Sequence, residues 1–257
     1  MKRIVIKVGS NVLTRENGTL DITRVSSLAD QIQALRQNGI EVILVTSGAV
    51  ACGRSLTKAA PALDEVQQRQ LYAAVGQVRL MDQYYRLFAD YGIAVGQILT
   101  MKKNFEGGEE YDNQRGCMEG MLESGVLPIV NENDAVSITE LMFTDNDELS
   151  GLVATMMGAD TLVILSNIDG LYDGDPADPE SRVVARIEPE DDLSSCIGAK
   201  RSSAGRGGMQ TKYKVAKQLA GSGVRVILAN GRRDGILVSL ATNPQEAVHT
   251  EFIPTKK

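Results

Sequence analysis

Short runs of aliphatic and β-branched residues recur along the chain, with segments of helical periodicity between them. The runs are apolar over nearly their whole length, which is typical of strands buried on both faces of a parallel sheet. Because helices would cover both faces of such a sheet, the pattern predicts an α/β fold: a three-layer α/β/α sandwich with a mostly parallel central sheet. The predicted strands are Arg3–Val8, Glu41–Thr46, Ala94–Leu99, Val126–Val130, Thr161–Ser166 and Arg225–Ala229.

The segments between the strands carry apolar residues at the three- and four-residue spacing of one helix face. Residues 136–143 alternate like an exposed hairpin, and residues 173–181, rich in Asp, Gly and Pro, predict a loop between two lobes. Helices are expected over about 23–38, 63–91 (one long helix or two consecutive ones), 116–123, 149–157 and 209–220.

Composition sets the class of protein. The 257 residues suffice for one large α/β domain or two small ones. The net charge of −6 argues against general nucleic-acid binding, which needs positive charge to neutralise phosphates. Three widely spaced cysteines without a CxxC pair suit reduced thiols in the cytoplasm. No apolar run approaches the ~20 residues of a membrane helix. We therefore expect a cytoplasmic protein with neither a nucleic-acid nor a membrane partner.

Charge is divided unevenly along the chain. Residues 116–181 contain fourteen Asp or Glu and no Lys or Arg, which leaves 27 basic against 19 acidic residues elsewhere. Such a division is expected when one region meets an amine or a metal and another meets phosphates. If the acidic region binds a phosphate, the positive charge must come from another part of the chain.

Polar side chains follow the fourth predicted strand in high density. Asn131-Glu-Asn-Asp134 comes directly after that strand, and Thr144-Asp-Asn-Asp-Glu-Leu-Ser150 follows a short alternating segment. These groups are costly to bury and contribute nothing to an apolar core. They fit a pocket that holds a zwitterionic small molecule or a metal ion.

Two turns at strand ends could receive an anion. Lys7-Val-Gly-Ser-Asn11 ends the first strand, where ligands of open α/β sheets bind, and Thr46-Ser-Gly-Ala49 joins the second strand to a helix start. A strand-end lysine with a turn glycine explains the first motif equally well, and a plain helix cap explains the second more often. Two such turns in one sheet carry more weight than either alone.

A third candidate for phosphate binding is Gly205-Arg-Gly-Gly-Met-Gln-Thr-Lys212, a glycine-rich turn that leads into a helix with a lysine in its first turn. It matches neither the P-loop pattern nor the dinucleotide fingerprint, and a glycine loop without a ligand is the plainer alternative. Ser166-Asn167, at the end of the fifth strand, could contact a nucleotide but decides nothing alone.

The chain has one histidine, His249, close to its C-terminus. Triads and histidine metal sites are therefore disfavoured, and the chemistry must proceed without a base that titrates near neutral pH. Phosphoryl transfer to a carboxylate meets this condition, because a carboxylate with a reference pKa near ~4.3 is already an ionised nucleophile at pH 7. Catalysis then requires only positioning and charge neutralisation.

Taken in order, the motifs resemble the glutamate 5-kinases of the amino-acid kinase family. They are Lys-Val-Gly-Ser (7–10), Thr-Ser-Gly-Ala (46–49), Ala-Ala-Val-Gly-Gln (73–77), Asn-Glu-Asn-Asp-Ala (131–135), Asp-Asn-Asp-x-Leu-Ser (145–150) and Gly-Gly-Met-x-Thr-Lys (207–212). Each is weak alone, but six in order over about 210 residues are specific, and they imply the amino-acid kinase fold.

The resemblance implies ATP-dependent phosphorylation of the γ-carboxylate of L-glutamate, the first step of proline synthesis, with Mg²⁺ accompanying ATP. It implies catalytic roles for Lys7, Lys212 and Asp147, the aspartate orienting the two lysines. Ser47, Asn131, Asp134 and Asn146 would bind glutamate. Lys7, Ser166, Asn167, Arg206, Gly207, Gly208, Met209, Gln210, Thr211 and Lys212 would contact the nucleotide, and no protein ligand for the metal is assigned.

The resemblance also implies a single kinase domain over residues 1–257, with a glutamate lobe over about 1–165 and an ATP lobe over about 166–257. Many members carry an additional C-terminal PUA domain, for which no residues remain, so a short form is expected. It implies feedback inhibition by proline and a homo-oligomer. The chain departs from the family's motifs at two places. Arg206 stands where the family has Thr before Gly-Gly-Met, and His249-Thr250 stands where it has Gly-Thr.

Other functions stay open at this point. Acetylglutamate kinases and aspartokinases have a second glycine where Ser10 follows Gly9 here, and a uridylate kinase would need a basic acceptor pocket that residues 116–181 do not offer. A non-catalytic amino-acid sensor on the same fold would be favoured by loss of Lys7, Asp147 or Lys212, and all three are present. A nicotinamide oxidoreductase lacks its glycine fingerprint.

Overall fold

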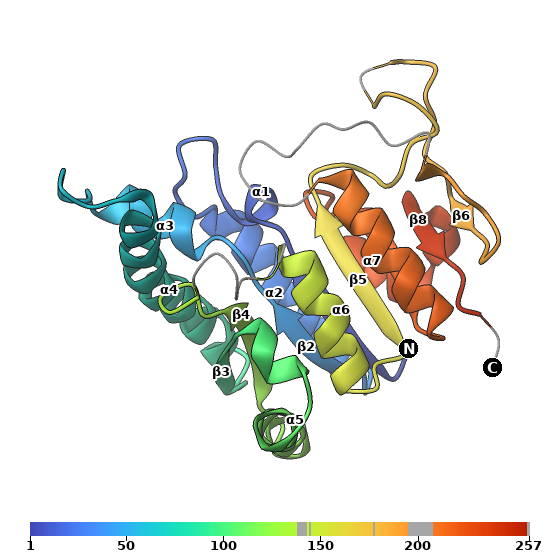
Figure 1. Ribbon diagram of the computed structural model, residues 1–257. Helices are drawn as coiled ribbons and strands as arrows, with labels where there is room; N and C mark the ends of the chain where they lie inside the picture. Colours follow the sequence, from blue (N-terminus) through green and yellow to red (C-terminus); the bar gives the residue numbers. More distant parts are fainter. Residues whose placement is uncertain (138–142, 144, 177, 195–207, 256–257) are drawn as a thin grey trace.

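The computed structural model describes residues 1–137, 143, 145–176, 178–194 and 208–255. A sheet of eight strands runs through the molecule in the order β3-β4-β2-β1-β5-β7-β8-β6 (Figure 1). In chain order the strands are β1 Arg3–Val8, β2 Glu41–Val45, β3 Val95–Thr100, β4 Leu127–Glu132, β5 Thr161–Ser166, β6 Arg186–Ile187, β7 Arg225–Asn230 and β8 His249–Phe252.

The helices lie between these strands in the chain, as a parallel sheet requires. They are α1 Ser10–Leu13, α2 Ile22–Gln37, α3 Ala49–Leu56, α4 Glu65–Ala89, α5 Glu109–Glu123, α6 Asn146–Met156, α7 Met209–Gly221 and α8 Ile236–Thr242, with short 3₁₀ turns at Lys102–Phe105 and Pro244–Glu246. In the parts of the chain that the structure describes, no helix has both the length and the apolar character needed to span a membrane.

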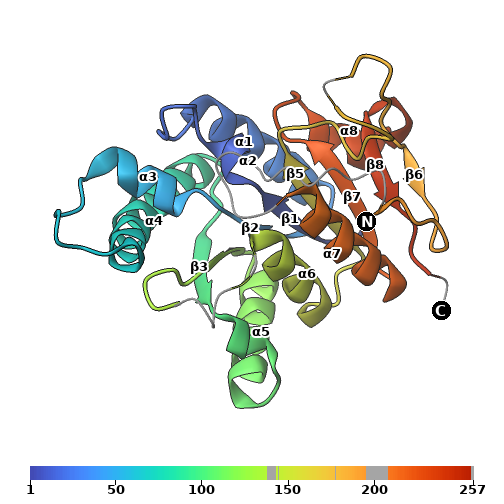
Figure 2. The same cartoon turned by 45° about the horizontal axis from the view of Figure 1, so that its top comes forward.

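The sheet is parallel except where β7 meets β8, and it is continuous through its centre because β1 pairs with both β2 and β5. Its two faces are covered by different helices (Figure 2). One core contains side chains of α2, α3, α4 and α8, and the other contains side chains of α5, α6 and α7. Successive residues of β1 divide between the two cores, Ile4 and Ile6 facing one and Val5 the other. The α/β/α expectation is confirmed.

Several helices begin at an aspartate that accepts backbone hydrogen bonds. Asp64 and Gln67 form a reciprocal capping box at the start of α4, and Asp21 caps α2. Asp145 caps α6 by accepting from the N–H groups of Asp147 and Glu148. This cap starts α6 three residues before the predicted position and so places part of the polar motif in its first turn.

The register of β4 also differs from expectation. The strand continues to Glu132, because Leu99 and Thr100 of β3 pair with Asn131 and Glu132. Those two polar residues therefore lie within the sheet, whereas the apolar pattern predicted that the strand would end at Val130. β6 and α8 were not predicted, because they are short and carry little periodicity. A last strand was expected near His249-Thr250 with its structure left open, and β8 begins at His249. The expected hairpin over 136–143 lies mostly outside the described residues.

Helices α3 and α4 pack at backbone contact. A Cβ atom added to Gly76 would lie 1.8 Å from the carbonyl oxygen of Ala49, and one added to Gly53 would lie 1.9 Å from that of Tyr72. Only glycine fits at either position. The contact fixes α4 against the start of α3, which directly follows the turn at Ser47.

We expect Gly76→Ala to destabilise the fold by at least the ~1–3 kcal/mol typical of overpacking, because the opposing atoms are backbone and cannot yield. Gly116→Ala in α5 is the matched control, since a Cβ there meets no atom within 4 Å and alanine favours a helix by up to ~1 kcal/mol. The free energy of unfolding from urea titrations measures both. Equal stability of the two variants would contradict the packing argument.

Candidate active site

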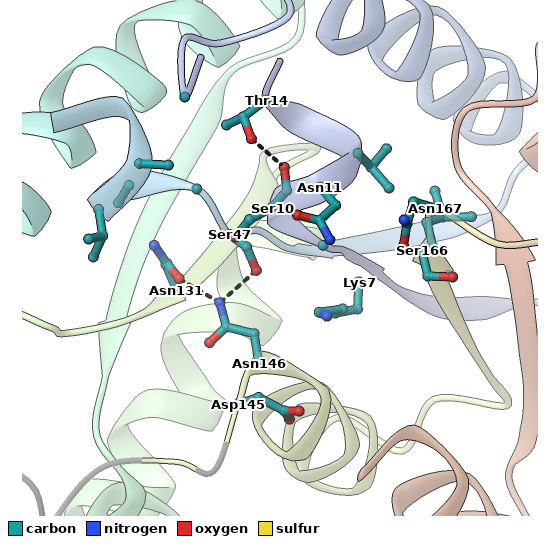
Figure 3. Close-up of a pocket in the computed structure, with 18 of the residues that line it drawn as sticks. Lys7, Ser10, Asn11, Thr14, Ser47, Asn131, Asp145, Asn146, Ser166 and Asn167 are labelled. Carbon is teal, nitrogen blue, oxygen red and sulfur yellow. Dashed lines mark hydrogen bonds between the residues drawn. The ribbon is translucent and has the colours of Figure 1, made fainter. Parts of the chain in front are cut away.

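A cavity of about 950 Å³ opens at the carboxyl ends of the central strands. Residues from both ends of the chain line it, as expected for a ligand site of an open α/β sheet. In Figure 3, Ser47, Asn131 and Asn146 lie on one side of Lys7, and Ser166 and Asn167 lie on the other. The predicted site residues that line the cavity are Lys7, Ser47, Asn131, Asp134, Asn146, Asp147, Ser166, Asn167 and Lys212.

A buried carboxylate joins two lysines at the floor of the cavity. Asp147 in the first turn of α6 is fully buried, and its Oδ1 lies 2.6 Å from Nζ of Lys7 in β1. Its Oδ2 accepts a hydrogen bond of 2.7 Å from Nζ of Lys212 in α7. One anion thereby holds two cations from distant parts of the chain, and the triad carries a net charge of +1 at pH 7. It is suited to hold a polyanion above it.

The acid–base behaviour of this floor is set by burial and by the lysines. Burial alone would raise the pKa of Asp147, but Lys7 and Lys212 outweigh it and lower the pKa below its ordinary value. The neighbouring Asp145 shows the opposite result, because its burial and the charge of Asp147 raise its pKa. Two carboxylates two residues apart are therefore driven in opposite directions.

Amide side chains form one wall. Nδ2 of Asn146 lies 2.6 Å from the carbonyl oxygen of Thr46, 3.0 Å from Oγ of Ser47 and 2.9 Å from Oδ1 of Asn131. Asn131 in turn donates to Oε1 of Gln77 in α4, at 2.9 Å. Three predicted substrate residues thus belong to one hydrogen-bonded network, and Gln77 supports it from behind.

The fourth predicted substrate residue, Asp134, makes an ion pair with Arg69 of α4, with Nη2 and Oδ1 2.6 Å apart. Burial raises the pKa of Asp134, and Arg69 opposes that rise. Nearby Glu132 accepts a hydrogen bond from the Phe143 N–H, and burial together with the charge of Asp134 raises its pKa to about 7. Arg69 lines the cavity beside these two acids.

The expected anion-binding turns differ in what their backbone can offer. The N–H of Gly9 donates to the carbonyl of Leu165, so it is not available to an anion, contrary to the prediction. The pairing follows from β1 lying beside β5 in the sheet. At the other turn, Gly48 has a positive φ of 94° and begins α3. Ser47, Gly48 and Ala49 line the cavity, so the N-terminus of α3 faces it.

The predicted nucleotide contacts are only partly brought together. Lys7, Ser166, Asn167 and Lys212 line the cavity, whereas Gly208, Met209, Gln210 and Thr211 are not among the described lining residues. Arg206 and Gly207 lie outside the described residues. Lys212 reaches the cavity because it lies at the start of α7, one helical turn after Gly208.

Sequence reasoning missed several cavity residues. Asp145, Glu132, Arg69 and Arg232 all line the wall, and none was assigned a role. Asp145 could have been found from its position directly before a helix start, which favours an N-cap. Arg69 and Arg232 give no local signal, because each reaches the cavity only through the packing of its own element against distant parts of the chain.

The model of the amino acid kinase family matches residues 2–230 of this chain. That match spans both walls of the cavity and all three members of the Lys7–Asp147–Lys212 triad. The chain therefore belongs to the amino acid kinase family.

Within that family the chain is similar to several glutamate 5-kinases. The chain is 58% identical to glutamate 5-kinase of Bacteroides thetaiotaomicron over 98% of its own length and 70% of that protein. It is 47% identical to glutamate 5-kinase of Chlorobaculum tepidum, over 99% of this chain and 70% of the relative. The enzyme of that name from Clostridium perfringens is 40% identical and is covered over 96% of its length.

Solved structures share the fold at much lower identity. Carbamate kinase from Giardia lamblia bound to AMP-PNP superposes with a TM-score of 0.70 at 18% identity and covers 99% of both chains. An isopentenyl phosphate kinase substrate complex gives 0.70 at 13% identity, covering 98% of this chain and 100% of that one. These likenesses show the fold alone.

The raised pKa of Glu132 predicts a pH dependence of stability. Between its ordinary value of 4.5 and about 7, the folded state holds a proton that the unfolded state has released, so this group makes stability fall as pH rises through that window. Glu132→Gln removes the titration. Relative to the unmodified protein, the variant should gain stability as pH rises from 5 to 7.5, measured by urea unfolding across that range.

The control is Glu123→Gln, which removes an exposed carboxylate at the end of α5. Its stability difference from the unmodified protein should stay nearly constant over the same pH range. Parallel pH profiles for Glu132→Gln and Glu123→Gln would show that Glu132 titrates as an ordinary carboxylate.

Proposed function

We propose that this chain transfers the γ-phosphoryl group of ATP to the γ-carboxylate of L-glutamate, the first step of proline biosynthesis. The observation that carries the proposal is the buried Asp147 with Lys7 at 2.6 Å and Lys212 at 2.7 Å. Lys7 of this triad lies between an amide-rich wall and the strand end that carries Ser166 and Asn167 (Figure 3). A kinase of this type needs this order: substrate wall, cationic centre, nucleotide wall.

The reaction is a direct in-line transfer. An oxygen of the ionised γ-carboxylate attacks the γ-phosphorus, the bond from that phosphorus to the β–γ bridging oxygen breaks, and ADP leaves with the electron pair. No proton is removed from the nucleophile, which agrees with the absence of a histidine from the cavity lining in the described residues. Lys7 and Lys212 stabilise the charge that spreads over the transferring oxygens.

Asp147 orients both lysines and reduces their mutual repulsion without contacting the substrate. Ser47, Asn131 and Asn146 hold glutamate through the network already described, and Asp134 receives its ammonium group. Residues up to about 165 form the glutamate side and those from 166 the ATP side. The predicted contacts of Gly208–Thr211 with the nucleotide belong to this proposal.

Magnesium fits the residues present. No group of three His, Cys, Asp or Glu among the described residues could hold a metal without help, but Mg²⁺ is commonly held by one or two carboxylates together with phosphates. Oδ2 of Asp145 is buried and accepts no hydrogen bond from any described residue, so it is a suitable ligand. Bound there, Mg²⁺ would neutralise phosphate charge during transfer.

The family membership supports three wider proposals. Proline, the end product, would compete with glutamate in the same pocket. The protein would form a homo-oligomer, since β3 is an edge strand, and Val78 and Tyr85 are exposed apolar side chains on α4. A cytoplasmic location would suit the free thiols of Cys52 and Cys117.

The activity is tested by trapping. The protein is incubated with ATP, Mg²⁺ and hydroxylamine, and glutamate, N-acetylglutamate or aspartate is added. An acyl phosphate is captured as its hydroxamate. Of the three acceptors, only glutamate should give a large amount of hydroxamate. A folded protein that forms no glutamate-dependent hydroxamate would overturn the proposal, and a preference for acetylglutamate or aspartate would move the chain to a sibling activity.

Replacing a lysine should affect turnover. We expect Lys7→Ala and Lys212→Ala each to lower kcat by about 10²–10³, with a smaller rise in KM for glutamate, because the charge they stabilise develops in the transition state. Asp134→Ala should do the reverse and mainly raise KM, since it binds the unreacting end of the substrate. Steady-state kinetics separates the two patterns, and near-normal turnover by Lys212→Ala would refute its assignment.

A further inference from the structure

We propose that Arg69 binds the α-carboxylate of the amino-acid substrate, so that the Arg69–Asp134 ion pair recognises the whole zwitterionic head group. This inference rests on the proposed function and deepens it. It assigns a specificity-determining residue on α4, an element outside the polar motifs that defined the site.

The pair is placed to meet a ligand. Nη2 of Arg69 lies 2.6 Å from Oδ1 of Asp134, and both residues line the cavity. The Arg69 side chain is 32% exposed and that of Asp134 11% exposed, so the arginine is the more accessible member of the pair. Nε of Arg69 is buried and has no hydrogen-bond partner among the described residues, so this arginine is not fully engaged within the protein.

Such a pair matches the head group of an α-amino acid. Its ammonium and carboxylate groups share one carbon atom, so the protein groups that bind them must also be neighbours. A carboxylate next to an arginine offers the complementary charges in that arrangement, and the planar guanidinium suits a carboxylate ligand. Asp134 alone would bind the ammonium and repel the carboxylate.

The other cations of the cavity are occupied elsewhere. Lys7 and Lys212 both contact Asp147. Arg54 stacks on the ring of Tyr72, with 5.5 Å from its guanidinium carbon to the ring centre. Arg232 donates to the carbonyl oxygen of Asn11, and Arg15 lies 3.8 Å from Asp21. Among the described lining residues, Arg69 is the cation paired with Asp134.

The local charge favours a cation at this wall. Residues 116–181 supply acids and no Lys or Arg. Glu132 and Asp134 come from that segment, and each is held in a desolvated position. A substrate with two carboxylates would meet net repulsion here unless a cation came from another element. Arg69 provides it from α4.

The helix that carries Arg69 is closely packed. Gly76 holds α4 against Ala49 at backbone contact, and Gln77 of the same helix hydrogen-bonds to Asn131 in the substrate wall. Residues 69 and 77 are about two helical turns apart, and both contact the substrate wall, Arg69 at Asp134 and Gln77 at Asn131. One helix thereby supports the amide network and carries the arginine, which favours a binding role over a surface ion pair.

The test compares glutamate with its 1-amide, isoglutamine, which keeps the ammonium and the reacting carboxylate but has a neutral group in place of the α-carboxylate. The unmodified enzyme should prefer glutamate in kcat/KM by about 10- to 100-fold, the range of one charged hydrogen-bonded contact. Arg69→Met should raise KM for glutamate by a similar factor and bring the preference close to one. Asp134→Asn should weaken the binding of glutamate and of isoglutamine by similar factors, so the preference for glutamate in kcat/KM should stay unchanged.

Arg54→Met is the matched control, because it removes another arginine of the cavity wall that is not paired with Asp134; KM and preference should stay within about threefold of the unmodified values. An unchanged preference in Arg69→Met, whether KM rises or not, would overturn the inference and leave Arg69 a support for Asp134. Melting temperatures show that each variant is folded. If the unmodified protein makes no glutamate-dependent hydroxamate, the proposed function itself fails, a result distinct from any of these.

Discussion

The structure of this site depends on one buried carboxylate. Asp147 is inaccessible to solvent and holds Lys7 and Lys212 at 2.6 and 2.7 Å. An unpaired charge at that depth would be strongly unfavourable, and two adjacent lysines without it would repel each other. The arrangement exists because β1, α6 and α7 each deliver one charge to the same point. Two features of the fold bring these charges together: the strand order around β1 and β5, and the cap that starts α6 at Asn146.

The uneven distribution of charge along the chain follows from the same requirement. The segment with no Lys or Arg provides the acids and amides of the cavity, and every cation near them comes from outside it. Lys7 and Lys212 neutralise Asp147, and Arg69 pairs with Asp134. The cavity is therefore assembled from complementary halves. Neither half could bind an anionic substrate and a polyanionic nucleotide without the other.

The comparison with distant structures separates the fold from the side chains that line the site. Carbamate kinase from Giardia lamblia shares the fold at 18% identity. At that distance, what the two chains share is the order of strands and the helices that cover them. The amide network around Asn146 and the Arg69–Asp134 pair are built from side chains that this fold positions. In our proposal these side chains select the substrate, while the shared fold positions them.

The sequence by itself determined the alternation of strands and helices, the α/β class, the family and the triad of Lys7, Asp147 and Lys212 as residues of one site. Apolar periodicity and strand-end motifs are local properties, so they can be recognised without a structure. Only the tertiary structure decided that Gly9 donates to Leu165, that β4 extends to Glu132, and that Asp145 caps α6. It alone brought Arg69 of α4 to Asp134, 65 residues away. Such facts depend on register and on the packing of one helix against another, and these are set by contacts between distant residues.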